Sequence, residues 1–185
     1  MNKAIRDLVL LAAVVLIGGC GVTPSNYLTG KPEFKFDSFF DGRLCAWGLL
    51  RDRSGEVTRK FIAEIDAYQK DGKVVLDEIF QFSDGERQKR VWRFTKDSEG
   101  WLGRAGDVVG SARGKVWGDS LHLEYTLAIT TEDSVWEVSM DDWLHLIDKN
   151  TLLGTTEMSK LGIGLGRIDI TIRKQSSGLE CGIDS

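Results

Sequence analysis

The sequence predicts an all-β domain, an antiparallel up-and-down meander in which each strand lies beside the next along the chain. From residue 37 to residue 174 apolar and polar side chains alternate with a period of two, which is typical of strands with one buried face. Pairs such as Asp71-Gly72 and Asp84-Gly85 separate the alternating runs and permit the positive φ of tight hairpins. Both prolines, Pro24 and Pro32, precede this region, so none interrupts a ladder of hydrogen bonds.

Each alternating run is interpreted as one strand. The predicted strands are residues 40–51, 58–69, 73–82, 87–97, 99–106, 109–118, 120–130, 134–147, 151–160 and 164–174. In the run 120–130, for example, Leu121, Leu123 and Tyr125 share one face, while His122 and Glu124 share the other. Consecutive strands joined by short turns leave two edges, and closure into a barrel removes both. We therefore expect a lipocalin-like barrel over residues 37–174, with a curved open sheet as the alternative.

The first 19 residues predict a lipoprotein signal peptide. Lys3 and Arg6 precede an apolar run over residues 8–17, which is shorter than the roughly 20 residues of a membrane-spanning helix. Ile17-Gly18-Gly19-Cys20 matches the bacterial lipobox, so we expect lipid attachment to Cys20; an ordinary signal peptide beside an incidental cysteine is the alternative. Residues 20–36 would form a lipidated tether, and residues 175–185 a C-terminal tail.

The residue after the lipobox predicts the membrane in which the protein is anchored. Several acyl chains at about 0.8 kcal/mol per buried methylene hold a protein stably on a membrane. Gly21 stands where an aspartate would favour retention in the inner membrane, so the outer membrane, on its periplasmic face, is expected rather than the inner one. The net charge of −4 and the absence of a basic stripe argue against nucleic acid.

Cys45 and Cys181 are the cysteines left after the lipobox. In an oxidising compartment such a pair usually forms a disulfide, here between the first strand and the tail. A buried thiol at Cys45 and a free thiol in the tail are the alternative.

Four residues are predicted to bind a ligand inside the barrel: Trp47, Glu78, Trp136 and Asp142. By alternation Asp142 and Glu78 fall on apolar faces, where a carboxylate must be paired, hydrogen-bonded or neutral. Asp142 would orient a ligand headgroup, or else cap backbone amides or pair with an arginine such as Arg93; Glu78 has the same alternatives, or is exposed by local twist. The tryptophans would line an apolar pocket, or else belong to the core.

Catalytic motifs are missing from the sequence, and the chain is predicted not to be an enzyme. There is no GxSxG nucleophile elbow, and the adjacent Asp141 and Asp142 point to opposite faces of one strand. His122 and His145 have no metal-ligand spacing, so neither a metal nor another cofactor is expected.

Four segments together resemble a known family, the uncharacterised proteobacterial lipoproteins called Domain of Unknown Function 3833. They are residues 45–48 (CAWG), 103–118 (GRAGDVVGSARGKVWG), 140–146 (MDDWLHL) and 158–170 (MSKLGIGLGRIDI). The resemblance covers residues 37–174 and implies a lipocalin-like fold and relatives encoded near enzymes that modify membrane fatty acids such as palmitate. It implies no catalytic or ligand-binding residue.

The expected function is that of an anchored binding protein, which holds a lipid or another apolar small molecule in the barrel. One alternative is a structural or assembly factor that binds another envelope protein. Another is an enzyme that acts on envelope lipids through Asp142 or His145.

Overall fold

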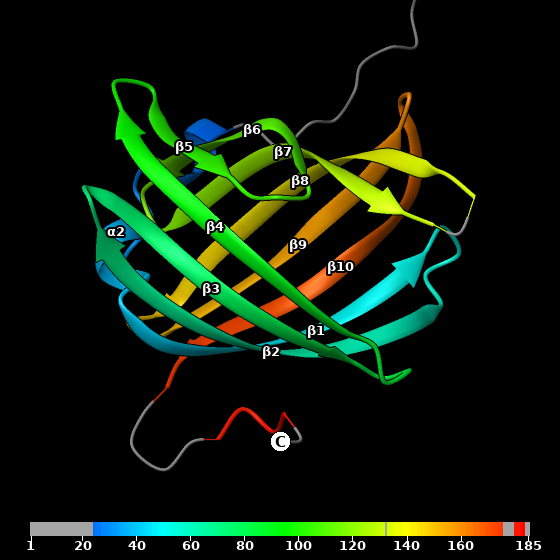
Figure 1. Cartoon of the computed structure of the whole chain (residues 1–185). Coiled ribbons are helices and arrows are strands. Elements are labelled where there is room, and N and C mark those ends of the chain that lie inside the picture. The colour runs from blue at the N-terminus through cyan, green and yellow to red at the C-terminus, as the bar shows by residue number, and fades with distance from the viewer. Residues whose placement is uncertain (1–23, 132, 176–179, 184–185) are drawn as a thin grey trace, which may run out of the picture.

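The computed structural model describes residues 24–131, 133–175 and 180–183, and its strands form one closed barrel (Figure 1). The elements in chain order are η1 (Pro24–Tyr27), α2 (Phe36–Phe39), β1 (Gly42–Asp52), β2 (Val57–Lys70), β3 (Lys73–Phe82), β4 (Arg87–Asp97), β5 (Gly100–Arg104), β6 (Val108–Trp117), β7 (Ser120–Thr130), β8 (Val135–Asp148), β9 (Thr151–Lys160) and β10 (Ile163–Lys174). Every strand pairs antiparallel with its neighbour in the chain, and β1 pairs with β10 to close the barrel. The predicted fold class is confirmed.

The strand boundaries agree with the predicted runs to within two residues. Turn chemistry explains the agreement, because Asp71 and Gly72 take φ of 51° and 71° between β2 and β3, and Gly85 takes 88° between β3 and β4. Glycines inside strands instead make room for aromatic rings. A Cβ added to Gly48 would lie 2.2 Å from the ring of Phe61, and one added to Gly103 would lie 2.4 Å from the ring of Phe94.

One end of the barrel is filled by an aromatic cluster. Its members are four phenylalanines that precede β1 and two aromatic residues of the barrel wall: Phe34, Phe36, Phe39, Phe40, Phe94 and Trp101. The ring of Phe36 stacks on Trp101 at 4.4 Å between centroids and meets Phe94 at 4.9 Å. Figure 1 shows α2, which carries Phe36 and Phe39, at this end of the barrel.

This cluster corrects the expected tether over residues 20–36. Within its described part, Phe34 and Phe36 are only 2% exposed, and the backbone N–H of Phe34 donates to the carbonyl of Gly118 in the β6–β7 turn. The prolines suggested an extended linker, but these two phenylalanines remove more apolar surface from water by packing on the barrel than a solvated linker would. Residues 34–36 therefore belong to a plug of the barrel end rather than to a spacer.

The barrel has two unlike halves along its axis. The closed half lies next to the plug, and its inward side chains, such as Leu44, Leu121 and Leu152, are buried. The open half lies toward the β1–β2, β3–β4 and β7–β8 turns, and many of its inward side chains, such as Phe80, Tyr125 and Ile168, are only half-buried. Solvent therefore reaches further into the open half.

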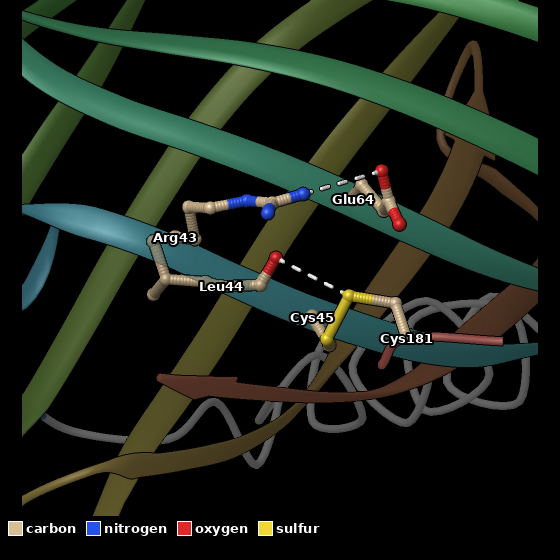
Figure 2. The surroundings of a disulfide bond; sticks show 5 residues. All are labelled: Arg43, Leu44, Cys45, Glu64 and Cys181. Carbon is tan, nitrogen blue, oxygen red and sulfur yellow. Dashed lines mark hydrogen bonds and ion pairs between the residues drawn. A yellow bond between two sulfur atoms is a disulfide. The ribbon is translucent and has the colours of Figure 1, made fainter. Parts of the chain in front are cut away.

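A disulfide joins β1 to the C-terminal tail. Cys45 and Cys181 are bonded, with 5.3 Å between their Cα atoms and a sequence separation of 136 residues. Figure 2 shows the bond beside the Leu44 carbonyl and close to the ion pair of Arg43 with Glu64. Both cysteine side chains are buried although Cys45 points away from the barrel interior, because the tail covers it.

Candidate functional site

Six polar side chains gather in the barrel interior where the closed half meets the open half. They come from five strands and one turn: Glu78 of β3, Arg90 of β4, Asp107 of the β5–β6 turn, Tyr125 of β7, Asp142 of β8 and Thr156 of β9. The register brings them together, because Glu78 lies directly opposite Arg90 and Asp142 lies directly opposite Thr156. We call these six residues the interior polar cluster.

Arg90 is held by an ion pair with Asp107. Its Nε donates to both carboxylate oxygens of Asp107, at 2.9 and 3.2 Å, and its Nη2 lies 2.7 Å from Oδ2. Burial alone would lower the pKa of Arg90, but the hydrogen bond to Asp107 and the nearby charge of Glu78 raise it. The guanidinium therefore stays charged, and its Nε and Nη2 face one carboxylate.

Glu78 is the most deeply buried acid of the interior polar cluster. It is 7% exposed and makes no hydrogen bond and no ion pair within the described part of the chain. Burial raises the pKa of Glu78 to about 7, against the opposing attraction of Arg90. At neutral pH this carboxyl therefore changes readily between its protonated and ionised forms.

Asp142 also has a raised pKa, and burial is again the main cause. Burial raises its pKa to about 7, while the hydroxyls of Thr156 and Tyr125 favour the ionised form. Its Oδ1 has no contact with solvent and no hydrogen-bond partner among the described residues. An acceptor that is hidden from water and unused is costly unless a proton or another molecule satisfies it.

Apolar side chains surround the interior polar cluster on the open side. They project inward from five strands and are half-buried: Leu50, Phe80, Phe82, Leu127, Met158, Ile168 and Ile170. Two cations lie over aromatic rings nearer the rim, Arg59 at 3.6 Å from the centroid of Phe82 and Lys160 at 3.8 Å from that of Trp136. Arg59 also pairs with Asp84 and Glu86 of the β3–β4 turn.

The structure brings two of the four predicted ligand-binding residues together. Glu78 and Asp142 belong to the interior polar cluster, and Trp136 lies at the rim of the open half, 44% exposed. Trp47 faces outward, because its neighbours Ala46 and Gly48 point into the barrel. Together with Leu49, Ile62 and Leu153 it lines a groove of about 770 Å³ on the outer face.

Sequence reasoning missed Arg90, Asp107, Tyr125 and Thr156. Arg93, which was one possible partner for Asp142, is exposed, whereas Arg90 has the same parity as the buried Trp92 and Phe94. That parity was the available signal for Arg90. Asp107 lies in a turn, where alternation gives no direction.

The histidines lie outside the barrel interior. His122 Nε2 is 2.9 Å from Asp141 Oδ1, and the two form with Glu124 an outward group whose ligand atoms lie within 4.8 Å of one another. Nδ1 of His145 is 2.8 Å from the hydroxyl of Ser120, which is fully buried and donates to Asp119. A serine that gives its proton to a carboxylate and has no access to solvent is not arranged as a nucleophile.

The described residues contain no helix that is long and apolar enough to cross a membrane. Cys20, the predicted site of lipid attachment, lies outside the described residues.

Comparison with known proteins decides the family. Residues 14–174 match the model of a family described as Protein of unknown function (DUF3833). The chain belongs to this family. No curated protein matches the sequence significantly.

Several solved structures share the barrel architecture at low identity. A redesigned β-barrel, mFAP1, bound to DFHBI is 9% identical with a TM-score of 0.42, over 75% of this chain and 97% of its own. The S-type phycobiliprotein lyase CPES from Guillardia theta is 10% identical with a TM-score of 0.48, over 77% of this chain and 92% of its own.

Proposed function

We propose that this member of the family is a membrane-anchored lipoprotein whose barrel binds a lipid or another amphipathic small molecule in its open half. One observation carries the proposal. Two carboxyl groups without an ion pair, the buried Glu78 and the half-buried Asp142, lie at the floor of a half that is otherwise lined by half-buried apolar side chains.

The energetics favour a ligand over a purely structural role. Burying an unpaired carboxylate costs several kcal/mol by order of magnitude, and an apolar pair of the same size would stabilise the barrel more. Perturbed carboxyls that converge among mainly apolar side chains are typical of binding sites. The ligand would place its polar group against Glu78 and Asp142 and its apolar part along Phe80, Leu127 and Ile168.

The anchor part of the proposal rests on the sequence of residues 1–21. Lipid on Cys20 would hold the barrel at the periplasmic face of the outer membrane, close to a supply of amphipathic molecules. No catalytic step is included in the proposal, because binding alone accounts for the interior polar cluster.

Labelling of growing cells with radioactive palmitate tests the anchor. The full chain should incorporate the label and sediment with outer-membrane vesicles, while Cys20→Ser should lose both properties. Cys45→Ser is the matched control and should keep the label. Label that persists in Cys20→Ser would refute lipid attachment at this residue.

Native mass spectrometry of the full chain, isolated gently from its membrane, tests the binding. A reproducible extra mass, released as one class of molecule and lost in Phe80→Arg, would support the proposal, because an arginine at this position fills the open half with charge. The matched control is Ile79→Arg, since Ile79 points outward from the same strand and is 37% exposed. Bare protein from every preparation would contradict it.

The outer groove favours one second candidate, the binding of another envelope protein. Trp47, Leu49, Ile62 and Leu153 expose apolar surface beside the disulfide-linked tail, and such patches often mark interfaces. Crosslinking in intact cells from Leu153, with Thr155 as the control position on the same face, should then recover one stoichiometric partner. Equal recovery from both positions would count against an interface in the groove.

A further inference from the structure

The charges of the open half do not balance, and the imbalance is negative. Among the described residues, the cations that project into it from the barrel wall are Arg59, Arg90 and Lys160. Arg59 pairs with two acids of the β3–β4 turn, Arg90 pairs with Asp107, and Lys160 lies over Trp136 at the rim. Glu78 and Asp142 are left with no ion pair.

We infer that the ligand's polar group is a cation, a primary ammonium carried on an apolar chain, which Glu78 and Asp142 bind from two sides of the barrel. The inference rests on the proposed function and narrows its ligand class. An ammonium group has three N–H donors and no acceptor. The carboxylates of Glu78 and Asp142 and the oxygen of the Thr156 hydroxyl are acceptors that match them.

An anionic headgroup fits this site poorly. A fatty-acid carboxylate or a phosphate would need several donors, but Arg90 presents its Nε and Nη2 to Asp107, so Nη1 is the one nitrogen of its guanidinium that Asp107 does not engage. An anion placed between Glu78 and Asp142 would also add a third negative group to a partly buried site, where repulsion is only weakly screened. A neutral hydroxyl group would satisfy one acceptor and leave the charge unbalanced.

The same geometry predicts how affinity depends on pH. Burial raises the pKa of both Glu78 and Asp142 to about 7, so at pH 6 both are mostly protonated. The other charged groups that act on them are Arg90 and Asp107 within the cluster and Asp77 and Asp141 on the outer face. An ammonium ligand requires the ionised carboxylate, so affinity should rise about tenfold per carboxyl from roughly pH 6 to roughly pH 8.

Calorimetric titration of the full chain in phosphatidylcholine nanodiscs tests the inference, with empty nanodiscs as the blank. The probes are octylamine, octanol and octanoate, which share one chain and differ in the polar group. Octylamine should bind at least tenfold more tightly than the other two, and its advantage should grow from pH 6 to pH 8. Ethylamine, which lacks the chain, should not bind measurably.

Substitutions of Glu78 and Asp142 test whether these two acids bind the ammonium group. Glu78→Gln and Asp142→Asn should each reduce the advantage of octylamine to about threefold or less, because an amide of the same size removes the charge. Asp77→Asn is the matched control, since Asp77 adjoins Glu78 but points outward, and it should keep the full advantage. A circular dichroism spectrum like that of the parent chain verifies that each variant is folded.

The outcomes separate the inference from the proposed function. Octanoate or octanol that binds as tightly as octylamine would overturn the ammonium inference and leave the binding function intact. Ethylamine that binds as tightly as octylamine would overturn the requirement for an apolar chain. If none of the chains binds, the proposed binding function fails as well.

Discussion

In the closed half of the barrel the inward side chains are aliphatic or aromatic and buried, whereas in the open half the same strands carry acids, an arginine and half-buried apolar groups. β7 shows the change within one strand, since Leu121 and Leu123 are buried and Tyr125 and Leu127 are not. The plug explains the difference, because the rings of Phe34, Phe36, Phe39 and Phe40 exclude water from one end only.

The comparison indicates that the closed half stabilises the fold, whereas the open half is suited to binding. Burial of apolar surface in the closed half stabilises the fold, and it offsets the cost of two acids that no ion pair neutralises. Sites that bind ligands often contain groups that are unfavourable for stability alone. Four predictions test this division, from the largest expected effect to the smallest.

Removing a plug ring should have the largest effect. Phe36→Ala leaves a cavity against Trp101 and Phe94, and such substitutions cost about 3 to 5 kcal/mol of unfolding free energy. Phe82→Ala is the matched change in the open half, where the ring is half-buried, and should cost roughly 1 to 2 kcal/mol. Urea titration followed by tryptophan fluorescence measures both. Equal costs would show that stability is not concentrated in the closed half.

The acids of the open half should make stability depend on pH. Burial raises the pKa of Glu78 from 4.5 to about 7, so between these values the folded chain holds a proton that the unfolded chain has lost. The stabilisation is therefore complete below pH 4.5 and is lost as pH rises through 7, by about 3 kcal/mol for a difference of this size. Asp142, whose pKa is also raised to about 7, acts in the same direction.

Urea titrations between pH 4.5 and pH 8 measure this loss. Glu78→Gln should reduce the dependence to the part that Asp142 contributes, while Asp77→Asn, which removes an outward acid from the same strand, should leave it in place. A parent chain that becomes more stable as pH rises through this range would contradict the burial of unpaired acids.

The fold was predictable to a greater depth than the site. Alternation reports which face of a strand is buried, and turn glycines report where the strand ends, so both are encoded within about ten neighbouring residues. The β7 pattern from Leu121 to Ile129 is an example that needed no knowledge of distant segments. The plug was missed because the two prolines dominate its local pattern, whereas its structure depends on contacts with β4 and β5.

The interior polar cluster depends on register, which joins residues far apart in sequence. Alternation placed Glu78 and Asp142 on inward faces, but only the pairing of β3 with β4 shows that Glu78 faces Arg90 rather than Arg93. Trp47 was placed in the interior because of its size, whereas its parity in β1 points outward. The type of a side chain indicates what it can bind, whereas its position in the alternation of the strand decides whether it faces the barrel interior or the outer surface.

Removing the only arginine of the interior polar cluster should have an intermediate effect. Arg90→Met leaves Asp107 without its partner and withdraws the charge that opposes the rise in the pKa of Glu78. Breaking a fully buried pair costs about 3 to 5 kcal/mol, but Asp107 is 38% exposed, so about 2 kcal/mol is expected at neutral pH. Adding Asp107→Asn to this variant should recover part of the loss, measured by the same urea titrations. A double variant that is less stable than Arg90→Met would contradict the pairing.

The rim of the open half should contribute least. Lys160 lies 3.8 Å from the centroid of Trp136, which is 44% exposed, and a cation over an exposed ring contributes about 0.5 to 1 kcal/mol. Lys160→Ala should therefore lower the unfolding free energy by no more than this amount, and Lys160→Arg should retain most of it. In a double-mutant cycle with Trp136→Leu, the coupling should fall within the same limits. A coupling as large as the cost of Phe36→Ala would mean that the rim of the open half contributes as much to the unfolding free energy as the plug does. The two halves would then differ in the polarity of their side chains but not in their contribution to stability.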